Sequence, residues 1–270
     1  MDCKNIMNIY NCNYNNNDVS LHEGPQEDGV RKVAIFDKDG TLTCMHSLWG
    51  PWLSQVAERL ENVTGTRLQE EIFKAMGFDS ASKTFGPGIL MEQPNRACFE
   101  YLHALLQKKG VPKDRAHRIV TSCYDNANAL LSGELVEFGD VQGIFTRLKD
   151  EGYYIAVDTA DSRIVTEGTL DRLGVAHLVD VIVCGNDPGV VPKPHAFTAL
   201  KICAKLGVEP KNAVFIGDTP TDAMCGRNSN CGLVISVLTG GVDRKLLEDK
   251  ADFVVESIEE AADLILSRAC

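Results

Sequence analysis

Two aspartates, one residue apart, directly follow an apolar run in this chain. Asp37 and Asp39 come after residues 33–36, and Gly40 follows them. The apolar run is typical of a strand buried in a parallel sheet, and side-chain alternation predicts both aspartates on one side, with Lys38 turned away. Two close carboxylates repel, so they must share a proton or a cation, for which magnesium is suitable. The alternative is an Asp-Gly turn that only closes a strand.

A hydroxyl follows the next strand that the pattern predicts, over residues 153–157. That strand leads into Asp158 and Thr159, and a hydroxyl there can donate a hydrogen bond to a phosphoryl oxygen. The structural alternative is a helix N-cap, a role that Asp161 or Ser162 could fill. Asp158 has no sequence-level explanation, since a carboxylate so near a bound phosphate is costly unless it points away or is paired.

Two further segments carry charge at strand ends or helix starts. Lys193 lies between two prolines, where its ammonium could offset repulsion between aspartates and an anionic substrate, although a solvated turn is the simpler interpretation. The predicted strand 213–216 ends in a glycine followed by Asp218, and Asp222 comes four residues later. Two carboxylates at this spacing suit a metal ligand with a supporting partner.

The elements that must hold these residues alternate along the chain. Strands and helices alternate from residue 139 onward, which predicts an α/β fold, a doubly wound parallel sheet with helices on both faces. The predicted strands are 153–157, 181–184, 213–216, 233–237 and 252–255, and the predicted helices are 142–151, 162–173, 197–206 and 258–268.

Helical spacing of apolar residues interrupts this alternation after the first motif. It predicts helices over 48–60, 66–76, 96–109 and 113–131, with a Gly- and Pro-rich loop over 78–93. We therefore expect a core domain of residues 30–43 and 139–270, an inserted helical cap of residues 44–138, and a disordered Asn-rich tail of residues 1–29.

Composition limits the classes of function. A net charge of −11 argues against a broad nucleic-acid or membrane surface. No apolar run is long enough to span a membrane, and no secretory signal is evident, so we expect a cytoplasmic protein, monomeric or homodimeric. The ten cysteines include no CxxC pair and are expected to be reduced thiols rather than zinc ligands.

In combination, the four motifs around Asp37, Thr159, Lys193 and Asp218 resemble those of the haloacid dehalogenase (HAD) superfamily in its phosphatase form. The resemblance covers about residues 31–268 and is closest to phosphoglycolate-phosphatase-like members with a helical cap. It implies the Rossmann-like HAD fold and a Mg²⁺-dependent phosphatase that acts on a small phosphorylated metabolite, with phosphoglycolate as the default substrate.

The resemblance also implies a role for each motif residue. Asp37 would attack phosphorus and form an aspartyl-phosphate, and Asp39 would act as acid and then as base. Thr159 and Lys193 would bind the phosphate. Mg²⁺ would be held by Asp37, Asp218 and the backbone carbonyl of Asp39, whereas Asp222 would hold a metal-bound water or orient Lys193.

Alternatives within and outside the superfamily remain at this point. A phosphomutase would use the same aspartates, and a phosphonate hydrolase would need a Schiff-base lysine from the cap, for which Lys74 and Lys83 are candidates by position. A non-catalytic phosphate-binding protein is the alternative of a different class. For specificity we expect the loop 78–93 to matter. His46, Trp49 and Trp52 could face the leaving group, although core packing is the favoured interpretation of both tryptophans.

Overall fold

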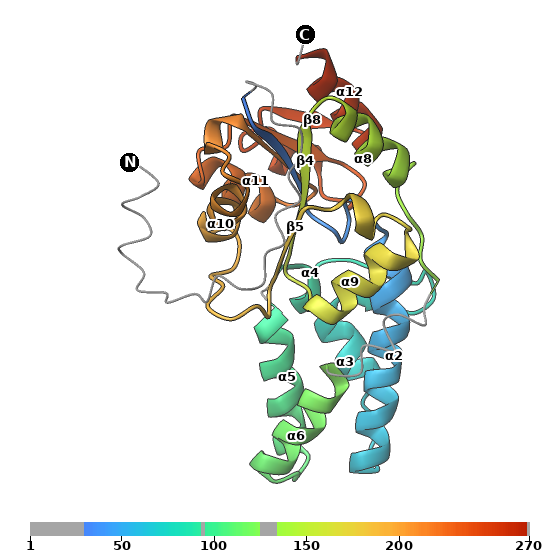
Figure 1. Ribbon diagram of the computed structural model, residues 1–270. Helices are drawn as coiled ribbons and strands as arrows, with labels where there is room; N and C mark the ends of the chain where they lie inside the picture. The colour runs from blue at the N-terminus through green and yellow to red at the C-terminus, as the bar shows by residue number, and fades with distance from the viewer. Residues whose placement is uncertain (1–29, 93–94, 125–133, 269–270) are drawn as a thin grey trace.

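The computed structural model describes residues 30–92, 95–124 and 134–268 (Figure 1). The Asn-rich tail expected over residues 1–29 lies outside the described residues, as do residues 125–131 of the helix expected over 113–131. Two parts are visible: an α/β part that contains the parallel sheet, and a group of helices below it in this view, formed within residues 45–124.

The α/β part is built on a six-stranded parallel sheet in the order β5-β4-β1-β6-β7-β8. From β1 the chain continues to β4 and β5 on one side, whereas β6 leads to β7 and β8 on the other side. Open sheets bind ligands beyond the carboxyl ends of the strands where the order reverses in this way. The strands are β1 (Lys32–Phe36), β4 (Tyr153–Thr159), β5 (Val181–Cys184), β6 (Ala213–Gly217), β7 (Leu233–Val237) and β8 (Phe253–Val255).

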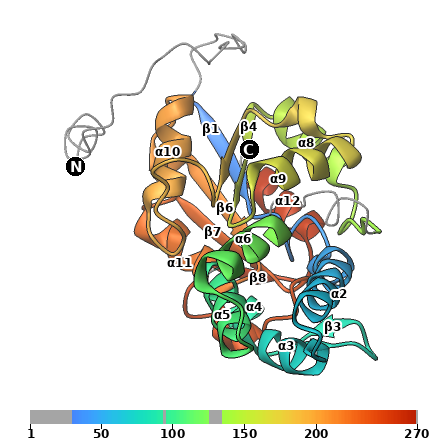
Figure 2. The same ribbon diagram turned by 90° about the horizontal axis from the view of Figure 1, so that it is seen from below.

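Helices cover both faces of this sheet (Figure 2). Val33 and Ile35 of β1 pack toward α10 (Phe197–Leu206) and α11 (Pro220–Asn228), whereas Ala34 and Phe36 face the opposite layer. That layer contains α8 (Val141–Asp150), α9 (Arg163–Arg172) and α12 (Ile258–Ser267). Because successive strand residues point to opposite faces, an uninterrupted apolar strand is needed between the two layers. The predicted doubly wound fold is confirmed.

Four helices make most of the inserted part. They are α2 (Met45–Thr64), α3 (Gln69–Met76), α5 (Asn95–Lys108) and α6 (Lys113–Tyr124), and their apolar stripes form one cluster. Val165 of α9 belongs to the same cluster, so the insert packs against the α/β part through that helix. The α-helical insertion predicted from the spacing is thus present, with its own hydrophobic core.

The segment predicted as a loop over residues 78–93 contains regular structure, which corrects that prediction. β2 (Phe78–Asp79) and β3 (Thr84–Phe85) pair as an antiparallel hairpin, and α4 (Ile89–Glu92) follows. The rings of Phe78 and Phe85 lie 4.8 Å apart across the hairpin. This cross-strand aromatic pair stabilises the hairpin. The glycines and prolines of the segment led the sequence pattern to predict a loop instead.

The two linkers between the parts run side by side. The Cys44 N–H donates to the Val136 carbonyl at 2.8 Å, and the Phe138 N–H donates to the Leu42 carbonyl at 2.9 Å. The insert therefore enters and leaves the α/β part at one place, next to the end of β1.

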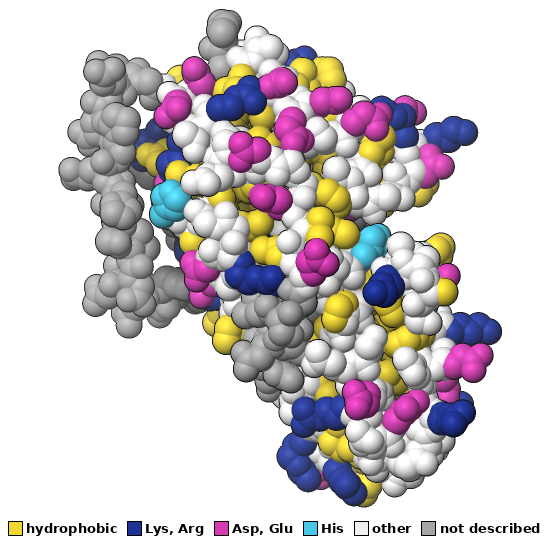
Figure 3. Space-filling model, turned by 90° about the vertical axis from the view of Figure 1, so that its right-hand side faces the viewer, with side chains coloured by type: hydrophobic (Ala, Val, Ile, Leu, Met, Phe, Trp, Pro, Cys, Tyr) yellow, Lys and Arg dark blue, Asp and Glu magenta, His cyan; other side chains and the backbone are white. Residues whose placement is uncertain are grey.

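Three short 3-10 helices complete the described structure: η1 (Ala176–Leu178), η2 (Pro210–Asn212) and η3 (Arg244–Leu246). Within residues 30–92, 95–124 and 134–268, no helix is long and apolar enough to cross a membrane. On the face in Figure 3, acidic and basic side chains are mixed over the α/β part without a continuous basic patch.

Candidate active site

A cavity of about 510 Å³ lies at the carboxyl edge of the sheet, between the α/β part and the insert. The six residues that the four sequence motifs supply for chemistry all line it. These residues are Asp37, Asp39, Thr159, Lys193, Asp218 and Asp222. The parallel strands explain the convergence, because β1, β4 and β6 end at the same edge and each ends in one of the motifs.

A buried ammonium and a buried carboxylate lie at the centre of this cavity. Lys193 Nζ is 2.7 Å from Asp37 Oδ1 and donates a further hydrogen bond to the Asp158 carbonyl at 3.0 Å. Burial raises the pKa of Asp37 to about 7, and the Asp222 and Asp39 charges add to this, while Lys193 opposes it. Burial alone would lower the pKa of Lys193, but the surrounding carboxylates raise it well above its usual value. Lys193 therefore stays charged.

Asp222 is positioned by the first turn of α11. Its Oδ2 accepts from the Thr219 backbone N–H at 3.0 Å, and the Thr219 side chain accepts from the Asp222 N–H, which forms a capping box. Asp222 Oδ1 lies 2.5 Å from Lys193 Nζ. Both carboxylate oxygens are thus engaged by protein groups, and the residue orients Lys193.

Two glycines, Gly40 and Gly240, make room for the Asp218 carboxylate. Its Oδ1 accepts from the Thr41 hydroxyl at 3.0 Å. A Cβ added to Gly40 or Gly240 would lie 2.3 or 1.8 Å from Asp218 Oδ2, and Gly40 has a φ of 94° that disfavours other residues. Burial raises the Asp218 pKa well above its usual value, and the Asp37 and Asp222 charges raise it further.

This set of oxygens fits a hard divalent cation. One oxygen from each of Asp37, Asp218 and Asp222 lies within 4.8 Å of the others, and oxygen donors are what Mg²⁺ prefers. Because Asp222 is occupied by Lys193 and Thr219, Asp37 and Asp218 are the carboxylates that would hold the ion. The raised pKa values of both reflect buried negative charge that a cation would neutralise.

Thr159 and Asp158 point to opposite faces of β4, as strand alternation requires. The Thr159 hydroxyl accepts from the Asp161 N–H at 3.1 Å, which leaves its own proton to donate. Asp158 Oδ2 accepts from the Thr198 hydroxyl of α10 at 2.6 Å, and burial raises its pKa to about 6. The Asp158 carboxylate, which the sequence left unexplained, is thus hydrogen-bonded to α10.

The sequence analysis missed a buried cation beside Asp39. Lys38 does not simply turn away: it is fully buried, and its Nζ lies 2.6 Å from Asp39 Oδ1 and 3.1 Å from Asp161 Oδ2. The two carboxylates raise the Lys38 pKa although burial opposes this. The pair links the first motif to the loop after β4. A lysine directly after a buried strand was the available signal.

The insert contributes an apolar surface to the cavity. Met45 and Trp49 of α2 and Leu90 and Met91 of α4 line it. We call these four residues the cap wall. Trp49 was expected to be a core residue, and it is both: it is only 6% exposed, yet it borders the cavity.

Other cap residues named from the sequence lie elsewhere. Trp52 borders a different cavity, and His46 stacks on Phe85 with ring centroids 5.8 Å apart. Lys74 and Lys83, the candidates for a Schiff base, are not among the residues that line the site cavity.

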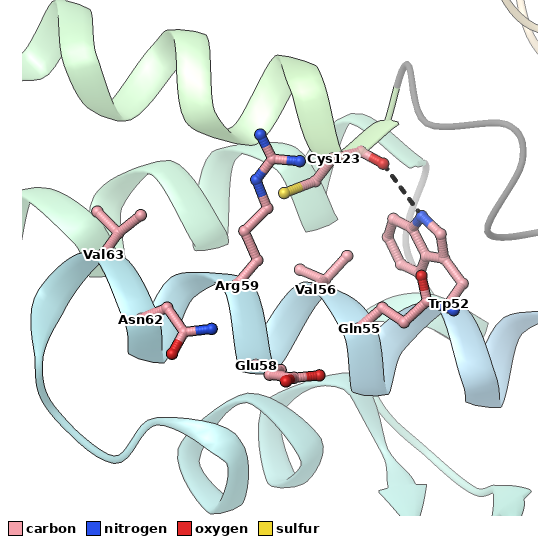
Figure 4. Close-up of a pocket in the computed structure, with 8 residues that line it drawn as sticks. All are labelled: Trp52, Gln55, Val56, Glu58, Arg59, Asn62, Val63 and Cys123. Atoms are coloured by element: carbon pink, nitrogen blue, oxygen red, sulfur yellow. Dashed lines mark hydrogen bonds between the residues drawn. The ribbon is translucent and has the colours of Figure 1, made fainter.

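A second cavity, of about 450 Å³, lies in the insert between α2 and α6 (Figure 4). The Trp52 indole N–H donates to the Cys123 carbonyl at 3.3 Å across it. Arg59 reaches toward Cys123, whereas Glu58 points to the other side of α2. None of the six motif residues borders this cavity. We regard it as a packing feature of the insert.

The fold and the site together define an α/β protein with a helical insert and strand-end aspartates. Residues 31–230 match the family model of haloacid dehalogenase-like hydrolases. The chain belongs to this family of enzymes, and the resemblance stated from the four motifs is confirmed.

Relatives in other organisms agree with this placement. A candidate pyrophosphatase, PpaX, of Clostridium perfringens is 30% identical over 163 residues, which is 58% of this chain and 73% of that protein. The phosphoglycolate phosphatase of Pasteurella multocida is 25% identical over 130 residues, which is 48% of this chain and 58% of that protein.

A solved structure shares the fold. The structure of a predicted phosphoglycolate phosphatase from Haemophilus somnus has a TM-score of 0.66 at 18% identity, covering 88% of this chain and all of that one.

Binding of Mg²⁺ is expected to depend on pH. In the metal-free protein Asp37 keeps its proton up to about pH 7, so protons compete with the cation at pH 6 and much less at pH 8. A hundredfold excess of Mg²⁺ over its Kd would stabilise the fold by about 2.7 kcal/mol. We expect the Mg²⁺-induced rise in Tm, measured by thermal scanning, to be larger at pH 8.

The raised pKa of Asp37 also determines how the stability of the metal-free protein changes with pH. Because the Asp37 pKa is raised on folding, its contribution to stability is present at low pH and is lost as pH rises through about 7. Asp218→Asn is the control and should abolish most of the Mg²⁺ effect. An equal rise in Tm at both pH values would argue against a cation between these carboxylates.

Lys38 is expected to be essential for stability. Lys38→Met would leave Asp39 and Asp161 without their shared cation, and removing one member of a buried ion pair costs about 3–5 kcal/mol. Adding Asp161→Asn to Lys38→Met should recover part of this loss, which urea unfolding of the two single variants and the double variant would measure. Strict additivity would contradict the coupling.

Proposed function

We propose that the protein is a Mg²⁺-dependent phosphatase that hydrolyses a small phosphomonoester through an aspartyl-phosphate on Asp37. One observation carries the proposal: Asp37 lies 2.7 Å from the buried ammonium of Lys193 in a cavity that Thr159 and Asp218 also line. A carboxylate nucleophile, a cation and a hydroxyl donor around one space suit a phosphoryl group.

In the proposed first step an oxygen of Asp37 attacks phosphorus as the bond to the leaving alcohol breaks. Asp37 must be ionised for this attack, and Lys193 favours that form by lowering the Asp37 pKa against the effect of burial. The phosphoryl oxygens would accept from the Thr159 hydroxyl and the Lys193 ammonium. Mg²⁺, held by Asp37 and Asp218 with the Asp39 carbonyl, would neutralise phosphoryl charge and orient the group.

Asp39 is proposed to move the protons. It would donate a proton to the leaving alkoxide oxygen, and would then take a proton from the water that hydrolyses the aspartyl-phosphate. Lys38 Nζ, 2.6 Å from Asp39 Oδ1, fixes the orientation of this carboxylate. Asp222 supports the first step indirectly, because it holds Lys193 against Asp37.

The comparisons support this reaction class and offer candidate substrates. The relatives described above are named for phosphoglycolate and for pyrophosphate, so phosphoglycolate-like small phosphoesters belong in the first assay. Closure of the insert over the cavity would exclude bulk water during the reaction.

Replacing the nucleophile is expected to abolish turnover. Asp37→Asn should lower kcat for phosphate release by more than about 10³-fold while far-UV circular dichroism stays unchanged. Inorganic phosphate would be measured with Mg²⁺ and with EDTA across a panel of phosphomonoesters. Activity like that of the unmodified protein in this variant would refute the mechanism. Recovery of isomerised phosphorylated product in place of phosphate would indicate a phosphomutase.

The role of Asp39 can be tested through the leaving group. Asp39→Ala should slow the hydrolysis of alkyl phosphates by about 10²–10⁴-fold. The loss should be smaller for 4-nitrophenyl phosphate, since nitrophenolate leaves without protonation. A loss of the same size on both substrates would mean that Asp39 is not the acid for the departing oxygen.

A further inference from the structure

The site cavity has two chemically different sides. The α/β side carries the charged and hydrogen-bonding motif residues, whereas the side that the insert contributes is the cap wall of Met45, Trp49, Leu90 and Met91. If the proposed function holds, phosphorus lies beside Asp37, and the leaving group extends from it toward the insert. The cap wall is therefore the surface that the leaving group meets.

The charges around the cavity disfavour a second anionic group on the substrate. Among the described residues that line it, six are aspartates and one is a lysine. That lysine, Lys193, is already shared between Asp37 and Asp222. Lys38 is fully buried between Asp39 and Asp161. A carboxylate or second phosphate on the leaving group would lie against the apolar cap wall, where no described lining residue offers it a free cation, and burying an unpaired charge there is costly.

Among the described residues, Arg163 near the loop after β4 has its charge engaged by other side chains. Arg163, at the start of α9, donates to Asp187 at 2.7 and 2.8 Å and lies 3.1 Å from Glu167. It is not among the residues that line the cavity. It therefore supplies no charge for recognition of an anionic leaving group.

The cap wall is held in a defined position by its packing. The Trp49 ring packs edge-on against Trp52 with centroids 5.1 Å apart. The turn before α4 lies directly on the end of α3: a Cβ on Gly88 would be 2.5 Å from the Gly77 nitrogen. Only glycines permit this approach, and it fixes where α4 presents Leu90 and Met91. A preformed apolar surface selects ligands by burial of their apolar area.

We infer that the substrate, under the function proposed above, is a phosphomonoester of an uncharged, mainly apolar alcohol that packs on the cap wall. The protein then discriminates against phosphomonoesters with a second anionic group, phosphoglycolate included. Each methylene buried on this wall should raise kcat/KM by about threefold or more, until the cavity is filled.

The test uses the full chain with Mg²⁺ and matched substrates. Ethyl, butyl and hexyl phosphate vary only in apolar length, and 4-phosphonooxybutanoate replaces the terminal methyl of butyl phosphate by a carboxylate. We expect kcat/KM to rise along the alkyl series and to be at least tenfold lower for the carboxylate than for butyl phosphate. A flat series, or a preference for the carboxylate or for phosphoglycolate, would overturn the inference.

Variants of the cap wall make the test specific. Met91→Lys, at a half-buried position, should raise kcat/KM for the carboxylate relative to butyl phosphate by tenfold or more, and Met45→Lys provides a second position. Met91→Leu should keep the dependence on chain length. Leu246→Lys, on the exposed 3-10 helix η3, is the control for added charge and should leave the ratio unchanged. Thermal scans would establish that each variant is folded.

The two proposals fail in different ways. Release of phosphate from 4-nitrophenyl phosphate, lost in Asp37→Asn, together with no response to Met91→Lys, would overturn the substrate inference and leave the phosphatase intact. Absence of Asp37-dependent phosphate release from every compound would refute the phosphatase proposal, and the substrate inference with it.

Discussion

The positions of the site residues in this protein depend on one buried ammonium, that of Lys193. Lys193 Nζ contacts Asp37 Oδ1, Asp222 Oδ1 and the Asp158 carbonyl, which belong to the end of β1, the start of α11 and the end of β4. Five aspartates of the site are almost fully excluded from water: Asp37, Asp158, Asp161, Asp218 and Asp222. Such a concentration of negative charge is tolerated in a protein interior only when a cation is held among it with good geometry. The lysine thus connects three elements and makes their carboxylates compatible with folding.

Local turn chemistry then assigns each carboxylate its place. The capping box of α11 engages Asp222, so that this residue serves the lysine. Gly40 and Gly240 leave space for Asp218 Oδ2, and a side chain on either glycine would occupy that space. Residues of one type thereby differ in their chemistry because their immediate neighbours differ. A second lysine, Lys38, repeats the principle directly after Asp37, where it joins Asp39 to Asp161.

Much of the site was predictable, because strand ends carry their own signals. A buried apolar strand followed by aspartate and glycine is a local pattern, and parallel strands bring such ends together, so the convergence of Asp37, Thr159 and Asp218 follows from the sequence. The partner of Lys38 was not predictable in this way, since Asp161 becomes its neighbour only through the pairing of β1 with β4. Trp49 and Trp52 share one helical stripe, and only tertiary packing decides that the first borders the site and the second a different cavity.

The paired linkers at Cys44 and Val136 have a consequence for how such a protein can vary. Because the chain leaves the sheet and returns to it at hydrogen-bonded neighbours, the length and content of what lies between them impose no geometric demand on β1 or α8. The insert can be lengthened, shortened or replaced while the reacting groups keep their positions. Reaction chemistry and substrate selection are therefore separable parts of one chain, open to change at different rates.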